Sequence, residues 1–267
     1  MRRLLLLCWL LAAAGRAADG DMDGVDDALD RCPGTPFALT VSADGCPVDD
    51  APSSLLIGVG SSYTTGTYGG TEPLDALSAD LAVMFFSGNF LFSAMSGYYV
   101  FGAEDPTVAH SEEGGMGDTY LSAGYTFAPT EGLTLTPTAY VKLATAAETI
   151  GTGQNDFGAS LLGIVRVGGS DLFAHYGYTV TGDGALTYRD ISFGSAGITL
   201  HPAPHVALSL SYDVSQAYLA ETPDIKSATL LGSYTLYDTL TLQAVYSYGL
   251  SDSAAEHALS IMLFKRF

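Results

Sequence analysis

The sequence has little positive charge, a single tryptophan and no long apolar run. Of its 267 residues, 10 are Lys or Arg and 29 are Asp or Glu. Three of the basic residues, Arg2, Arg3 and Arg16, lie near the N-terminus, so a chain without that segment would carry 7 − 29, or about −22 charges. Because phosphate groups are bound by patches of Lys and Arg, nucleic acid is excluded as a partner.

The longest uninterrupted apolar run, Leu4 to Ala14, has only eleven residues. A transmembrane helix needs about 20 apolar residues, so a helical membrane protein is excluded. With 48% hydrophobic and 15% charged residues, the chain is not disordered either. It is instead rich in Gly (31), Tyr (16) and Phe (12), which is typical of β-structure. Two classes remain, a large secreted β-protein and an outer-membrane β-barrel.

The N-terminus has the features of a secretory signal peptide. A basic start is followed by the apolar run, and Gly15 and Ala17 place small residues before a cleavage site after residue 17. Residues 1–17 are therefore predicted to be removed, together with Cys8. Cys32 and Cys46 are the two cysteines left, and an even number in an exported chain predicts one disulfide.

An acidic segment follows, with the spacing of a calcium-binding loop. Counted from Asp19, carboxylates occupy positions 1, 3, 5, 9 and 12, and Gly24 at position 6 allows a sharp turn. The alternative is a solvated acidic linker, since Asp and Gly are common in loops. The predicted Ca²⁺ ligands are the carboxylates of Asp19, Asp21, Asp23, Asp27 and Asp30 and the carbonyl of Val25.

Residues 18–50 resemble the thrombospondin type 3 repeat of bacterial envelope proteins. The resemblance rests on the Asp pattern, on the run Cys32-Pro33-Gly34-Thr35-Pro36 and on Gly45-Cys46-Pro47. It implies that the Asp residues hold calcium and that the two cysteines are bridged. A segment this short cannot build a hydrophobic core, so metal and disulfide together would have to stabilise it.

Residues 54–267 repeat segments of about ten residues in which apolar and small or polar side chains alternate, the periodicity of β-strands. Alternation by itself does not separate a β-sandwich from a barrel. The predicted strands are 54–64, 76–86, 90–100, 118–127, 133–144, 155–166, 171–180, 190–201, 206–215, 226–236, 239–250 and 257–267.

The connections between these strands alternate in length. The first, third and later odd connections are long, as at 101–117, whereas the even ones, such as 87–89, have at most five residues. Long loops on one side and tight turns on the other are typical of transmembrane barrels. The fold class expected is therefore all-β: an antiparallel up-and-down barrel of about twelve strands in a Gram-negative outer membrane. An even number of strands would place both termini on the turn side, in the periplasm.

The expected partners follow from this location. They are the outer-membrane lipid and lipopolysaccharide, and also a small-molecule solute. The final residue, Phe267, resembles the terminal signal that is read by the outer-membrane assembly machinery, although Lys265 departs from it. A secreted β-sandwich that ends in Phe by chance is the alternative.

Short glycine-rich strings resemble the outer-membrane family named for the meta-pathway of phenol degradation. They are Val141-Lys142-Leu143 with residues 151–158, Tyr176-Gly177-Tyr178 with Gly182-Asp183, and residues 249–252 with Phe267. The resemblance implies a barrel of about twelve strands that passes small, often aromatic or apolar, compounds. It brings no catalytic residues with it.

The strand phases place polar and charged side chains on the inner wall. Charges of both signs and tyrosines could orient a solute, but they could equally form a salt-bridged plug that fills a closed barrel. Acidic loop residues such as Glu104 are interpreted as solvated. The predicted lumen residues are Asp80, Met84, Met95, Tyr120, Tyr140, Lys142, Asp156, Arg166, His175, Asp213, Gln243 and Arg266.

Two functions are compatible with these features. One is an outer-membrane channel for small solutes with a periplasmic calcium-binding repeat; the other is a non-transporting barrel that anchors this repeat and displays it to periplasmic partners. No enzymatic activity is expected, because none of the five histidines lies in the His-x-Ser-Asn pattern of the outer-membrane phospholipase.

The calcium interpretation can be tested on residues 18–50. Calorimetry with oxidised peptide is expected to show binding with a Kd on the order of 10⁻⁴ to 10⁻³ M, as for extracellular modules. Replacing Asp21 and Asp23 by Asn should abolish the heat, because both carboxylates would leave the ligand set. If millimolar calcium gives no heat with the original sequence, the segment is a linker.

Overall fold

The structure is a computed structural model. It describes residues 25, 30–31, 41–42, 44–46, 53–70, 72–104, 114–130, 132–147, 149–182, 188–203, 205–237 and 239–267. Within these ranges no helix is long and apolar enough to cross a membrane.

Twelve long strands and two short ones make up a single antiparallel sheet. The short ones are β4 (Gly115–Met116) and β6 (Phe127–Thr130). The long strands are β1 (Ser54–Gly66), β2 (Leu74–Ser87), β3 (Phe90–Phe101), β5 (Thr119–Tyr125), β7 (Leu133–Leu143), β8 (Asp156–Val167), β9 (Ser170–Val180), β10 (Ile191–Ala203), β11 (Val206–Ser215), β12 (Ile225–Tyr237), β13 (Leu240–Gly249) and β14 (His257–Arg266).

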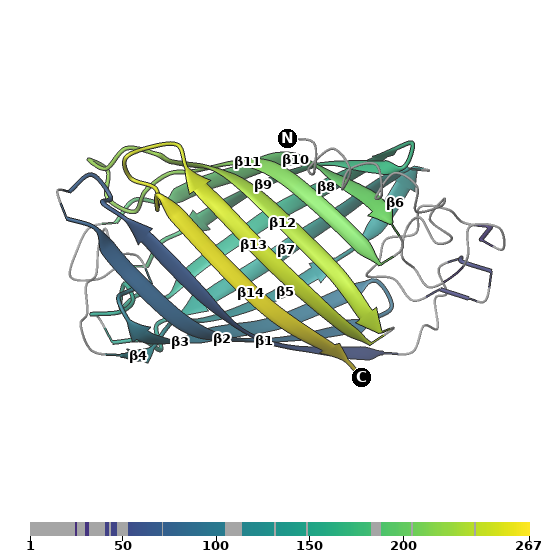
Figure 1. Cartoon of the computed structure of the whole chain (residues 1–267), viewed down its shortest axis with the longest axis horizontal. Coiled ribbons are helices and arrows are strands. Elements are labelled where there is room, and N and C mark those ends of the chain that lie inside the picture. Colours follow the sequence, from purple (N-terminus) through teal and green to yellow (C-terminus); the bar gives the residue numbers. More distant parts are fainter. Residues whose placement is uncertain are drawn as a thin grey trace, which may run out of the picture.

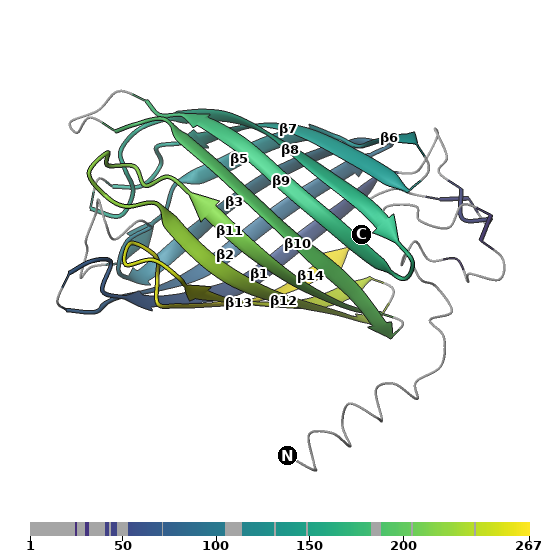
Figure 2. The same cartoon turned by 90° about the horizontal axis from the view of Figure 1, so that it is seen from above.

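The sheet closes on itself between its first and last strands. β1 pairs with β2 on one side and with β14 on the other, where Leu56 lies opposite Arg266. Beyond the ladder, the Leu55 N–H donates to the Phe267 carbonyl at 3.2 Å, and the Phe267 N–H donates back at 2.8 Å. Figures 1 and 2 show the strands running diagonally around one continuous wall. The predicted twelve-strand barrel is therefore confirmed, and the sandwich alternative is wrong.

Both ends of the barrel sequence lie at the end with the tight turns, as Figure 1 shows for the start of β1 and the C-terminus. The turns consist of two residues each, for example Gly88 and Asn89 or Gly168 and Gly169. The positive φ of Gly88 (53°) and Gly168 (64°) suits hairpins of this length. The longer connections all lie at the opposite end, hereafter the loop end.

One predicted strand, 118–127, departs from the structure. It is divided at Thr126 into β5 and β6, and both parts pair with β7. The Thr126 N–H donates to the Asn89 carbonyl at 2.9 Å, and its hydroxyl contacts the Thr136 hydroxyl at 3.0 Å. Both contacts keep the registers of the flanking ladders, in which Phe90 pairs with Tyr125 and Gly124 with Thr138. The irregularity lies farther along, where the β6–β7 register shifts between Phe127 and Thr130, as in bulges near barrel rims.

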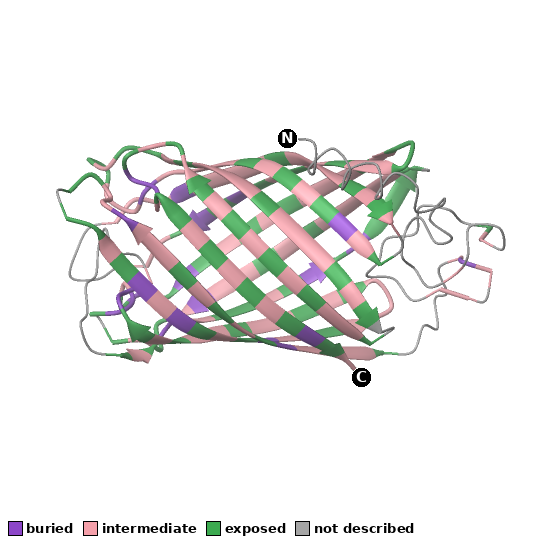
Figure 3. Ribbon diagram, viewed as in Figure 1, coloured by how far each residue is buried: buried purple, intermediate pink, exposed green. Residues whose placement is uncertain are grey.

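Burial alternates along the strands and places the apolar residues outside. Large side chains such as Val59, Leu161 and Leu210 are exposed on the outer surface, and Figure 3 shows exposed and less exposed residues alternating across the wall. Among the described side chains, the only large one that is fully buried is Asp156. The apolar surface therefore forms an outer belt instead of a core, as expected for a wall that faces lipid.

Aromatic rings add to this belt at the end of the barrel that carries the tight turns, hereafter the turn end. Phe85, Phe90, Phe92, Tyr125 and Phe127 are all exposed and form a continuous series of ring contacts, the closest being Phe90 and Tyr125 at 4.9 Å between centroids. Aromatic residues at this level are typical of the interface between hydrocarbon and headgroups.

On the inner wall, several aromatic rings lie over glycines of neighbouring strands. An added Cβ on Gly158 would be 2.1 Å from the Tyr140 ring, and one on Gly177 would be 2.1 Å from the Phe193 ring. Gly58 is covered in the same way by Phe264. These glycines allow the large rings to pack directly on the backbone of the neighbouring strands.

This arrangement predicts that Gly158→Ala destabilises the barrel. The new methyl group would displace the Tyr140 ring, and overpacking of this kind costs about 1–3 kcal/mol. Gly163→Ala is the matched control, because Gly163 lies on the same strand and its added Cβ would be 3.4 Å from the nearest described atom. Urea unfolding of the refolded protein in detergent measures both. Equal midpoints would show that the ring is not held against Gly158.

Candidate functional site

The inner wall holds the candidate site. The registers place Tyr120 opposite Lys142, and Lys142 opposite Asp156, so these three residues form one row across β5, β7 and β8. The registers between neighbouring strands, taken in order around the sheet, show that the other predicted lumen residues lie on the same face as this row. They are Asp80, Met84, Met95, Tyr140, Arg166, His175, Asp213, Gln243 and Arg266.

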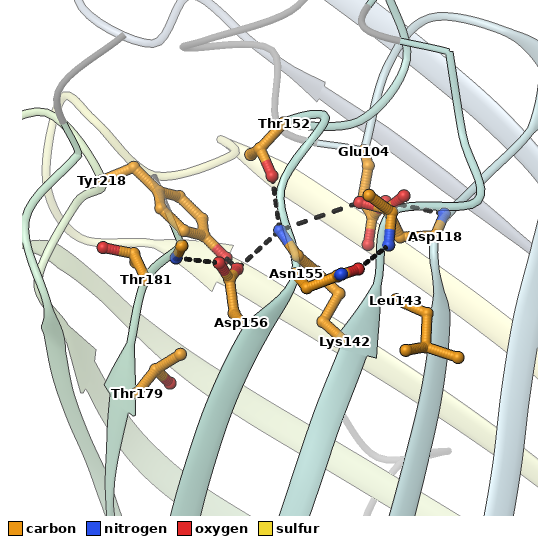
Figure 4. A network of polar contacts seen from close by, with 12 residues as sticks. Glu104, Asp118, Lys142, Leu143, Thr152, Asn155, Asp156, Thr179, Thr181 and Tyr218 are labelled. Carbon is orange, nitrogen blue, oxygen red and sulfur yellow. Dashed lines mark hydrogen bonds and ion pairs between the residues drawn. The ribbon is translucent and has the colours of Figure 1, made fainter. Parts of the chain in front are cut away.

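Lys142 is the centre of a buried polar network at the loop end (Figure 4). Its Nζ lies 2.6 Å from Asp156 Oδ2, 2.5 Å from Thr152 Oγ1 and 3.7 Å from Asp118 Oδ2. Lys142 and Asp118 are 2% exposed and Asp156 is 1% exposed. Buried charges are tolerated when they are paired, and removing one partner of such a pair typically costs about 3–5 kcal/mol.

Two further groups hold Asp156. The Gly182 N–H donates to Asp156 Oδ1 at 3.0 Å, and the Tyr218 hydroxyl donates to Oδ2 at 3.4 Å. The Tyr218 ring also lies 5.2 Å from Lys142 Nζ, within the range of a cation–π interaction. These contacts tie the segments that carry Thr152, Gly182 and Tyr218 to the inner wall at the loop end.

Glu104, interpreted from the sequence as a solvated loop residue, is part of the same network, and that interpretation is wrong. Its carboxylate accepts from the Tyr120 hydroxyl at 2.5 Å and from the Asp118 N–H at 3.2 Å. Burial raises the pKa of Glu104, partly opposed by the hydrogen bond from Tyr120. The Glu104 backbone is fixed as well, since its N–H donates to the Ile150 carbonyl at 2.8 Å.

Two cavities lie on either side of this network. One, of about 290 Å³, is lined by Lys142, Thr152 and Tyr218 among others. The second, of about 260 Å³, is lined by Asp80, Met95 and Met262 among others. Glu104, Asp118 and Tyr120 line both cavities, which therefore adjoin each other.

The middle of the inner wall is aromatic. The Phe193 ring lies 6.3 Å from Tyr140 and 5.5 Å from His175, measured between centroids. The Tyr140 hydroxyl lies 2.6 Å from the Thr179 hydroxyl, which fixes the ring against Gly158.

The turn end carries a second charged group. Arg166 Nε donates to Asp171 Oδ1 at 3.0 Å, and His201 Nε2 lies 2.9 Å from Asp171 Oδ2. Arg266 lies on the same face near this end. On the inner wall, Arg166 and Arg266 therefore lie near the turn end, whereas Glu104, Asp118 and Asp156 lie with Lys142 at the loop end.

Asp213 and Gln243 lie on the inner wall apart from both networks. Asp213 accepts from the Ser211 hydroxyl at 3.1 Å, and Gln243 lies opposite Met262 in the register. The structure thus divides the predicted lumen residues between separate levels of the wall and does not bring all of them into one site.

Most of the predicted calcium ligands, Asp19, Asp21, Asp23 and Asp27, lie outside the described residues, as does Cys32. Asp30 packs on Gly45, whose added Cβ would meet Asp30 Oδ1 at 1.8 Å, and Gly45 has a φ of 76° that suits glycine. Cys46 is disulfide-bonded, and its pairing with Cys32 stays a prediction. Among the described residues, no group of three or more His, Cys, Asp or Glu side chains has the arrangement of a metal site.

No protein-family model matches the chain, and no curated protein matches its sequence. Among solved structures it is similar to an outer-membrane channel from Pseudomonas putida F1, with a TM-score of 0.60 and 12% identity over 80% of this chain and 95% of that one. It is also similar to the KdgM porin, with a TM-score of 0.55 and 10% identity over 79% of this chain and 99% of that one. The KdgM porin in complex with disordered oligogalacturonate gives a TM-score of 0.53 at 9% identity.

These neighbours are named as a channel and porins. A likeness at so low an identity shows the fold alone, so the expected absence of enzymatic activity stays a prediction. What the geometry and the comparisons establish together is an outer-membrane-type β-barrel with a polar inner wall and a buried, ion-paired network at its loop end.

Proposed function

We propose that the protein is an outer-membrane channel for small solutes, preceded by a calcium-binding repeat. The observation that carries the proposal is the inner wall. It is polar, several of its large rings pack directly over glycines, and it leaves cavities of about 290 and 260 Å³ beside the loop-end network. A wall that merely filled the barrel would need its large side chains to point to the axis. The names of the structural neighbours, a channel and porins, add support.

The contacts between wall and loops at the loop end would limit the size of the solute. Lys142, Asp156 and Tyr218 join inner wall and loops, so that only small molecules would pass without moving the loops. Below this level the Tyr140, His175 and Phe193 rings offer faces on which aromatic or apolar solutes could stack. Aromatic or apolar solutes are also the compounds that the resemblance to the meta-pathway family implies.

The alternative is a barrel that does not transport and that displays the calcium repeat to periplasmic partners. The same ion-paired network favours it, because a buried Lys142–Asp156 pair also suits a permanent plug.

Conductance in planar bilayers separates the two functions. The purified full chain is expected to give discrete single-channel steps, small because the loop end is narrow. The control is the same preparation after heat denaturation, which should be silent. Correct folding is checked by the change in gel migration between unheated and heated samples. A correctly folded protein that gives no steps would contradict the channel and favour the anchoring function.

For the orientation, we propose that the loop end faces the medium and that both termini are periplasmic, with lipid and lipopolysaccharide around the outer belt. Phe267, exposed at the end of β14, would then be accessible to the assembly machinery from the periplasm. Calcium bound by Asp19 to Asp30 would lie on the periplasmic side as well.

A pair of cysteine substitutions tests this orientation. Gly70→Cys lies in the loop after β1, whereas Gly169→Cys lies in the tight turn between β8 and β9; both glycines have negative φ, and an added Cβ at Gly169 meets nothing within 4 Å. A membrane-impermeant maleimide applied to intact cells is expected to label only the first variant, and both after permeabilisation. Labelling of Gly169→Cys alone on intact cells would reverse the orientation.

A further inference from the structure

The larger of the two cavities lies where the connections of the loop end meet. Its lining residues come from the connections after β1, β3, β7, β11 and β13, and Tyr120 and Lys142 contribute from the inner wall. A solute that enters the proposed channel from this end would pass through the cavity. The side chains that line it would therefore decide what can enter.

Tyr68 reaches this cavity from the connection between β1 and β2. Residues 64–70 read Thr-Thr-Gly-Thr-Tyr-Gly-Gly, so Tyr68 carries the only large side chain in this stretch. Of the turn residues 67–70, it alone lines the cavity, and it is partly buried whereas Gly69 and Gly70 are exposed. The side chain, and not the backbone of the turn, therefore reaches the cavity.

The backbone at Tyr68 is strained. The Gly70 N–H donates to the Thr67 carbonyl at 2.7 Å, which closes a β-turn. The central residues of this turn, Tyr68 and Gly69, have φ values of 48° and 80°. Two positive φ values in succession are typical of a type I′ turn, which favours Asn, Asp and Gly. A bulky side chain in this region is an outlier, and such outliers are concentrated at functional sites.

The turn is held in place by the neighbouring connection after β13. The Thr67 hydroxyl donates to Glu256 Oε1 at 3.3 Å, and a Cβ added to Gly66 would lie 2.8 Å from the Glu256 backbone nitrogen. Gly66 thus lies directly against the backbone of that connection, and Figure 1 shows both connections at the loop end. These contacts fix the base of the turn from which the Tyr68 side chain extends.

We infer that Tyr68 sets the upper size limit for solutes at the loop end. The other tyrosines that line the cavity, Tyr120 and Tyr218, donate hydrogen bonds to Glu104 and Asp156 and so help to hold the buried network. Tyr68 extends from a turn whose backbone suits Asn or Gly better, so the ring is what this position contributes. The inference rests on the proposed function, because only a channel has solutes to select.

Swelling of phosphatidylcholine liposomes that contain the refolded full chain measures the size limit, with glycerol and sucrose as neutral solutes. The original chain is expected to admit glycerol much faster than sucrose. Tyr68→Asn should raise the ratio of the sucrose rate to the glycerol rate about threefold or more, because pore diameter controls the passage of neutral solutes. Tyr68→Phe keeps both the ring and the strain, so its ratio should equal that of the original chain.

His205→Asn is the matched control for a general loosening of the barrel. Among the described residues, His205 is the other non-glycine residue with a positive φ, 65°, and it is exposed in the tight turn between β10 and β11. Both Asn variants should fold, because Asn accommodates a positive φ, and urea unfolding in detergent checks this. Tyr68→Gly repeats the test if Tyr68→Asn does not fold. An equal rise of the ratio in His205→Asn would overturn the inference.

The same measurements separate this inference from the proposed channel. If the original chain admits glycerol and Tyr68→Asn leaves the ratio unchanged, the channel stands and the role of Tyr68 is wrong. If only Tyr68→Asn admits glycerol, Tyr68 closes the loop end, which supports the inference and contradicts an open channel in the original chain. If neither protein admits glycerol, both the channel and the role of Tyr68 are wrong.

Discussion

Everything in this structure depends on the backbone hydrogen bonds that join β1 to β14. Closure there joins the first and last strands, so that each of the twelve long strands has a partner on each side. Because strand side chains alternate, a closed wall has only two faces, one lined by a belt of Val, Leu, Phe and Tyr and the other by Ser, Thr, Gly and charged residues. The fold thus converts a two-residue repeat in the sequence into an apolar outside and a polar inside.

The inner face is itself divided along the barrel axis. Lys142 and Asp156 are direct neighbours in the ladder between β7 and β8, and their pairing anchors loops from other parts of the chain over the opening. Carboxylates from those loops outnumber the single lysine there, whereas Arg166 and Arg266 lie near the other end. A solute that crosses the barrel would therefore meet regions of opposite charge in sequence, which is the kind of arrangement that sets selectivity in pores.

The strands could be predicted closely from the sequence, because period-two alternation and turn residues are local signals. Tyr120, Lys142 and Asp156 were assigned to the inner face by phase alone, and the ladder places them in one row. Glu104 could not be assigned, since it lies in a long connection without periodicity and meets Tyr120 only after that connection folds inward. Asp118, the first residue of the predicted strand 118–127, was not among the predicted lumen residues, yet it lies 3.7 Å from Lys142.

The pairing of β1 with β14, which ends in the hydrogen bonds between Leu55 and Phe267 and is hereafter called the seam, also determines when the barrel can close during biogenesis. The first barrel strand to leave the ribosome finds its second partner only when the last residues of the chain have been synthesised. Until then the nascent sheet has two open edges and a large apolar face, the state most exposed to aggregation. Contacts of such long sequence separation also form slowly. The chain must therefore be kept unfolded or guided in transit, and a stop codon even a few residues early would remove the seam and not merely shorten a strand.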